Sequence, residues 1–139
     1  MKSLLIAALV IACSHAASAT PSVLFEIDRE LGTQPVTPES AIVLYANGAW
    51  RSTDSQHTTT GRMTADQLAD VQRDVDDSPW TSLPNRGASC GAITLERTVY
   101  VARGKIVWTA AGCSHNHLDD ASAKNLAALQ QLAATIAKA

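Results

Sequence analysis

The densest group of side chains that could bind a metal lies in residues 113–120, CSHNHLDD. If this segment is extended, His115 and His117 project to the same side, because alternate side chains of a strand share a face. With Asp119 nearby, these imidazoles have the chemistry of zinc or copper ligands. His115 and His117 are therefore candidate metal ligands. In the alternative interpretation, Asp119 or Asp120 caps a helix and both histidines are solvated.

A catalytic set is harder to assemble from this sequence. Ser114 and His115 are sequence neighbours, whereas nucleophile–base sets combine residues that are distant along the chain. The acidic pairs Asp76-Asp77 and Asp119-Asp120 would diverge by about 100° on a helix, so neither forms a carboxylate dyad. No phosphate-binding glycine loop occurs. We therefore expect a protein that is not an enzyme and that needs no cofactor.

Length and composition narrow the class further. The chain has 139 residues, of which 46% are hydrophobic and 17% charged, with a formal net charge of −2. This length fits one domain, and the hydrophobic content is sufficient for a core. Proteins that bind nucleic acid usually carry a strongly positive surface, and a net charge so close to zero does not indicate one.

The first 19 residues have the pattern of an export signal. Lys2 precedes the apolar run 4–12, which is too short to span a bilayer, and Ala17-Ser18-Ala19 fits a signal peptidase site. We expect cleavage after Ala19, which leaves residues 20–139 as one exported domain, periplasmic or secreted. In a second interpretation, Val10-Ile11-Ala12-Cys13 resembles a bacterial lipobox, and lipidation of Cys13 would anchor the protein to a membrane.

Two further cysteines, Cys90 and Cys113, lie in the exported part. An even pair in an exported chain predicts one disulfide. Closing a loop of this length stabilises a fold by roughly 3 kcal/mol in the chain-entropy model.

The hydrophobic pattern predicts an α+β domain. Alternation of apolar and polar residues predicts a first strand, and Thr64 with Gln67 forms the capping box of a helix that ends at Ser78-Pro79. The predicted strands are 22–31, 41–46, 49–53, 93–101 and 105–111, and a second helix runs from Asp119 or Asp120 to the C-terminus. The order β-ββ-α-ββ-α favours an antiparallel sheet of about four to five strands with two helices packed on one face.

One aromatic pair is a candidate binding surface. Asn47-Gly48 is the strongest short signal for a two-residue hairpin, and this register places Tyr45 opposite Trp50. Exposed beside Arg51, these residues have the composition of a protein-binding hot spot. Tyr45, Trp50 and Arg51 are therefore the candidate contacts for a partner protein.

The segment 63–84, MTADQLADVQRDVDDSPWTSLP, resembles the helix and aromatic plug of emfourin-type inhibitors of thermolysin-like (M4) metalloproteases. The later ERTVYVARGKIVW and the leucine-rich C-terminal segment occur in a similar order. The resemblance implies inhibition of a protease and transfers no inhibitory residue. We expect a small exported, disulfide-stapled protein-binding domain with a protease as partner, and the alternative is a periplasmic metal-binding protein that uses His115 and His117.

Overall fold

The computed structural model describes residues 20–31, 37–84, 96–112 and 116–138. The elements in these ranges follow one another as a first group of strands, a helix, a second group of strands and a final helix. In chain order they are β1 (Val23–Leu31), β2 (Thr37–Tyr45), β3 (Ala49–Asp54), β4 (Thr58–Arg62), α1 (Ala65–Asp76), β5 (Ser82–Pro84), β6 (Glu96–Ala102), β7 (Lys105–Ala111), β8 (Asn116–Leu118) and α2 (Asp120–Ile136).

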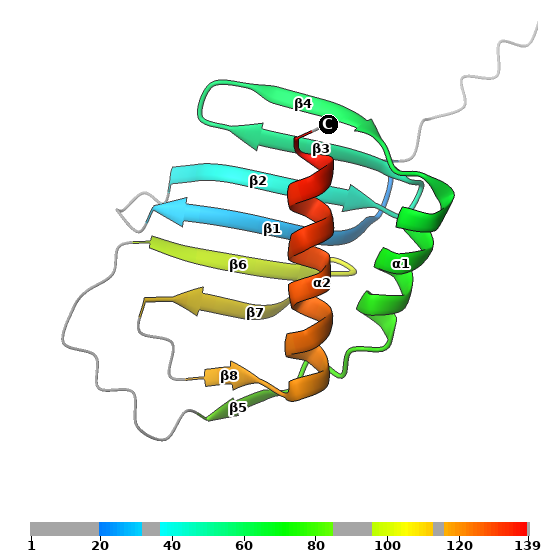
Figure 1. Ribbon diagram of the computed structural model, residues 1–139. Helices are drawn as coiled ribbons and strands as arrows, with labels where there is room; N and C mark the ends of the chain where they lie inside the picture. The colour runs from blue at the N-terminus through cyan, green and yellow to red at the C-terminus, as the bar shows by residue number, and fades with distance from the viewer. Residues whose placement is uncertain (1–19, 32–36, 85–95, 113–115, 139) are drawn as a thin grey trace, which may run out of the picture.

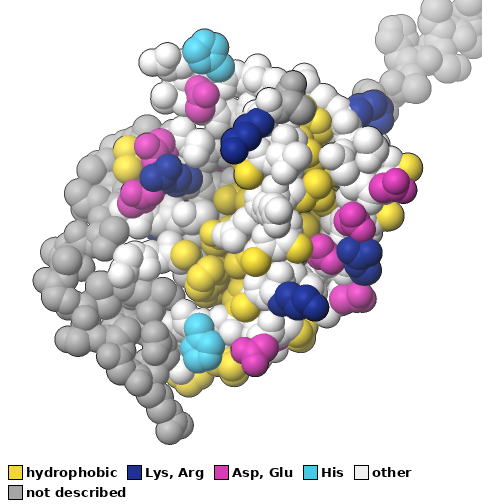
Figure 2. Space-filling model, viewed as in Figure 1, with side chains coloured by type: hydrophobic (Ala, Val, Ile, Leu, Met, Phe, Trp, Pro, Cys, Tyr) yellow, Lys and Arg dark blue, Asp and Glu magenta, His cyan; other side chains and the backbone are white. Residues whose placement is uncertain are grey.

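Six strands form one antiparallel sheet in the order β4-β3-β2-β1-β6-β7, and β5 and β8 form a separate antiparallel pair. Both helices lie on the same face of the large sheet, and α2 crosses its strands (Figure 1). Figure 2, which views this face, shows charged side chains over α1 and hydrophobic side chains beside α2. The predicted α+β class with two helices on one face is confirmed, and the sheet has more strands than the predicted four to five.

The additional strand β4 was not predicted, because the polar segment 54–61 has the composition of a loop. The Asp54 carboxylate accepts hydrogen bonds from the backbone N–H groups of Gln56 and His57, both at 2.8 Å, and this turn reverses the chain. Residues Thr58–Arg62 then pair with β3. These backbone hydrogen bonds also hold the pKa of Asp54 below its ordinary value.

The core lies between the sheet and the helices. Phe25 of β1 is fully buried and stacks on Trp80, with ring centroids 6.4 Å apart. A bulge in β1 between Val23 and Phe25 adds Leu24 to the same core, although simple alternation predicts that Leu24 faces water. Trp80 therefore packs against the core from the segment that follows α1.

Side-chain caps define the beginnings of both helices. The predicted capping box is present, because the Thr64 side chain accepts from Gln67 N at 3.2 Å and Gln67 Oε1 accepts from Thr64 N at 2.8 Å. Asp119 caps α2 by accepting from Ser122 N at 3.0 Å, which confirms the capping interpretation of this acidic pair.

Within the described ranges, no helix has the length and apolar character needed to cross a membrane.

Candidate functional site

The sheet face opposite the helices is the first candidate surface. Strand β1 lies inside the sheet, between β2 and β6. Because Phe25 packs on the helix side, the alternation of a strand sends Glu26 and Asp28 to the other face. Neither described helix covers this face (Figure 1), which we call the open face.

The open face holds carboxylates that are partly withdrawn from water. Glu26 lies in register between Val43 of β2 and Val101 of β6. Burial raises the pKa of Glu26, the nearby Asp28 raises it further, and attraction to Arg51 opposes both effects. Burial also raises the pKa of Asp28. The face therefore combines apolar side chains with acids that ionise less readily than in water.

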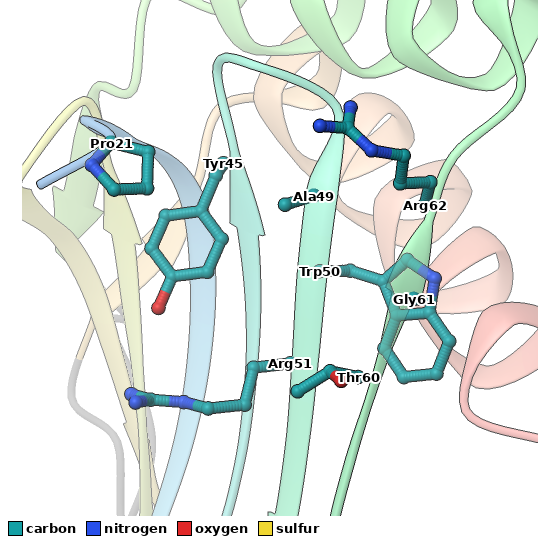
Figure 3. A pocket seen from close by; sticks show the side chains of 8 residues that line it. All are labelled: Pro21, Tyr45, Ala49, Trp50, Arg51, Thr60, Gly61 and Arg62. Atoms are coloured by element: carbon teal, nitrogen blue, oxygen red, sulfur yellow. The ribbon is translucent and has the colours of Figure 1, made fainter. Parts of the chain in front are cut away.

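A shallow depression of about 460 Å³ lies at the β2–β3 end of this face. Figure 3 shows the side chains of Tyr45 and Arg51 on one side of the hairpin, while Trp50 points to the other side. We call this the Tyr45–Arg51 depression. Its lining residues are Pro21, Tyr45, Ala49, Trp50, Arg51, Thr60, Gly61 and Arg62.

Two polar side chains of the depression, Arg51 and Tyr45, have no hydrogen-bond or ion-pair partner within the described part of the chain. The Arg51 guanidinium forms no ion pair or hydrogen bond there, and its electrostatic neighbour is Glu26. The Tyr45 hydroxyl likewise forms no hydrogen bond with a described residue. A partner can therefore engage both groups without breaking a hydrogen bond or an ion pair of the described residues.

The predicted pairing of Tyr45 with Trp50 is wrong by one residue. Tyr45 O accepts from Gly48 N at 3.0 Å, and Gly48 has φ +85° while Asn47 is not left-handed. This is a type I turn followed by a left-handed glycine, which makes a three-residue loop instead of a two-residue one. Leu44 consequently pairs with Trp50.

In the observed register Trp50 lies in the core and not, as predicted, at the surface. Trp50 is 7% exposed and packs over Gly61 of β4, since a Cβ at that glycine would lie 2.6 Å from the indole ring. The structure brings Tyr45 and Arg51 together on the open face and turns the Trp50 side chain to the helix side, from where it borders the depression. A one-residue change of register reverses the faces of the whole strand, so Trp50 leaves the face of Tyr45 and Arg51 takes its place there.

A second concavity, of about 580 Å³, lies on the helix side between α2, β7 and β8. We call it the α2–β7 cleft. Its walls are formed by Tyr100, Trp108, Ala110, His117, Leu118, Asp120, Ala123, Leu126 and Gln130.

Aromatic side chains give this cleft a fixed wall. Tyr100 and Trp108 stack with centroids 5.6 Å apart, and Gln130 Nε2 donates to the Tyr100 hydroxyl at 2.8 Å. Burial raises the pKa of Tyr100. The cleft could not be predicted from the sequence, because it depends on how α2 crosses β7.

The predicted metal ligands are only partly described. His117 is exposed on β8 at the α2–β7 cleft, and His115 lies outside the described residues. In the described ranges, no group of three or more His, Cys, Asp or Glu side chains could hold a metal ion. Cys13, Cys90 and Cys113 also lie outside these ranges, so the predicted lipidation and disulfide stay predictions.

Models of known protein families, curated proteins and solved structures were each compared with this chain, and none matches it.

Proposed function

We propose that this chain is a small exported binding domain that engages a partner protein through the Tyr45–Arg51 depression and does no catalysis. The observation that carries the proposal is the pair of unpartnered polar groups, Tyr45 Oη and Arg51, set in a largely apolar depression. Tyrosine and arginine are enriched among residues that dominate binding energies, because each combines a broad contact surface with directional hydrogen bonding.

A rigid support favours this surface over a flexible loop. Tyr45 ends β2 and Arg51 lies in β3, so both side chains are held by the antiparallel pairing of two strands. The turn between them is fixed by the Asn47 side chain, which accepts from Ala49 N at 3.0 Å. Little conformational entropy is lost when a partner binds a surface that is already ordered.

A protease is the partner class that we propose to test first, because the segment 63–84 resembles the emfourin-type inhibitors. The export signal predicted in residues 1–19 agrees with a partner outside the cytoplasm. An inhibitor of this kind would occupy the enzyme's cleft without being cleaved.

The test is a titration of a thermolysin-like metalloprotease with the domain 20–139, with cleavage of a fluorogenic peptide as readout. We expect inhibition that weakens at least about tenfold in Tyr45→Ala and in Arg51→Ala, as for hot-spot residues. Arg73→Ala on α1 is the matched control, because Arg73 is also exposed but lies on the helix side. Equal inhibition by all variants would exclude this surface.

If the protease is not inhibited, the binding proposal is tested separately. The immobilised domain is exposed to culture supernatant of the producing cells, alongside the Tyr45→Ala/Arg51→Ala double variant. Retention of a protein by the unaltered domain and by Arg73→Ala, but not by the double variant, supports a binding domain with another partner. The absence of any protein whose retention depends on Tyr45 and Arg51 would overturn the proposal.

A further inference from the structure

The α2–β7 cleft differs from the Tyr45–Arg51 depression in having a strand edge as one of its borders. In the large sheet β7 is the last strand and pairs with β6 alone among the described residues. The N–H and C=O groups on its outer side are therefore without a strand partner in the described structure. Such an edge can accept another extended chain, because its donors and acceptors repeat with the spacing of a strand.

The cleft limits what can reach that edge. Trp108 and Ala110 of β7 form one wall, Leu118 of β8 and the first turns of α2 form the opposite wall, and all border the same cavity. Figure 1 shows that β8 lies beyond β7. The edge of a second large sheet would have to pass β8 in order to pair with β7. A single extended segment fits this opening better than another folded domain.

The side chains of the cleft specify the character of that segment. Ala110 and Ala123 leave room beside the stacked rings of Tyr100 and Trp108. Figure 2 shows hydrophobic side chains at the surface beside α2, over β6 and β7. An aliphatic or aromatic side chain would bury apolar surface here, which stabilises a complex by roughly 25 cal/mol per Å² before the cost of association.

Charge at the rim adds a second preference. Asp120 is the one Asp, Glu, Lys or Arg among the residues that line the cleft, and it is exposed. A neighbouring lysine or arginine in the ligand would therefore be attracted, with an effect that salt reduces.

From these observations we propose that the α2–β7 cleft binds an extended peptide segment of a partner protein. The segment places an apolar side chain between α2 and Trp108, pairs its main chain with the free edge of β7, and carries a basic residue toward Asp120. Strand addition of this kind obtains affinity from main-chain hydrogen bonds and specificity from the pocket for a side chain. The proposal rests on residues different from those of the Tyr45–Arg51 depression, so either can fail while the other stands.

The test uses the domain 20–139 and an array of short, end-capped threonine–lysine peptides that differ at their central residue. We expect the domain to bind peptides with a central Leu, Ile, Val or Phe and to bind the central Asp peptide at least about tenfold more weakly. On binding, hydrogen exchange should slow at alternate amides of Lys105–Ala111, the amides that point away from β6. Binding without protection in β7 would overturn the proposal.

Filling the cleft provides a second measurement. Ala123 lines the cleft from an exposed position on α2, so Ala123→Phe should occupy the opening and reduce peptide affinity at least about tenfold. Ala128→Phe is the matched control, because Ala128 is exposed on α2 and does not line the cleft. Equal affinity of both variants for the peptide would contradict the placement of the peptide in the cleft.

Binding of an apolar dye such as anilinonaphthalene sulfonate, with no binding of any peptide, would identify a small-molecule site and overturn the proposal.

Discussion

Gly61 of β4 provides a direct test of the packing that places Trp50 in the core. A Cβ added at Gly61 would lie 2.6 Å from Cε2 and Cζ2 of the Trp50 ring and 2.7 Å from its Nε1. Ordinary carbon contacts are about 3.5–4.0 Å, so the ring or the strand must move by roughly 1 Å in Gly61→Ala. Trp50 is 7% exposed within the core cluster, and its neighbours restrict that movement.

The expected loss follows from two opposing effects. Overpacking a well-ordered core costs about 1–3 kcal/mol. Replacing glycine by alanine regains about 0.4–1 kcal/mol, because the unfolded chain loses conformational freedom. Gly61 does not have the positive φ found at Gly48 and Gly104, so no backbone strain is added. Gly61→Ala should therefore lower the free energy of unfolding by about 1–2 kcal/mol.

Urea denaturation of the domain 20–139, followed by circular dichroism, measures this loss. Thr60→Ala is the control, because Thr60 is the exposed neighbour in the same strand and should change stability by about 0.5 kcal/mol or less. In the Trp50→Phe background, the smaller ring should relieve part of the clash and reduce the cost of Gly61→Ala. Equal stability of Gly61→Ala and Thr60→Ala would refute the observed register and packing of Trp50.

Three further predictions concern the caps and the open face. Thr64→Ala removes the capping box of α1 and should cost about 1 kcal/mol in thermal or urea unfolding, whereas Thr64→Ser should restore most of it. Ser122→Ala should cost about 1–3 kcal/mol, because the buried Ser122 Oγ accepts from Trp80 N at 2.8 Å and that N–H would lose its partner; an unchanged stability would contradict this role. Asp28→Asn should increase stability at pH 7, since burial raises the pKa of Asp28 in the folded state and its ionised form is disfavoured there. That gain should disappear near pH 3, where the carboxyl is protonated in both states, and a gain independent of pH would argue against it.

Features that depend on residues close in sequence could be predicted. The capping box of Thr64 and Gln67 needs residues three apart and a following apolar stripe, and both are visible in the sequence. The Asp119 cap is local in the same sense. Alternation predicts the faces of β1 correctly apart from Leu24, because a bulge depends on the neighbouring strand rather than on the strand's own residues.

Features set by contacts between distant elements could not be predicted. Asn47-Gly48 is compatible with a two-residue and a three-residue loop, and the choice decides which face receives Trp50. Leu83 has the hydrophobicity of a core residue, yet it is 38% exposed because the short strand β5 lies away from the large sheet. The α2–β7 cleft likewise arises from the path of α2 across β7 and from the separation of β7 and β8.

The two proposed surfaces also differ in position, and this has a measurable consequence. Arg51 lies in β3 on the open face, whereas Trp108 lies in β7 and lines a cleft on the helix side. Four strand spacings separate β3 from β7 in the sheet order, which is about 19 Å. Groups so far apart and on opposite faces should not interact, so losses of affinity in Arg51→Ala and Ala123→Phe should add within about 0.5 kcal/mol for a partner that contacts both. If each variant affects a different ligand, the domain has two independent binding sites. Strong non-additivity would instead require a change in the sheet itself, which hydrogen exchange across β1 would detect.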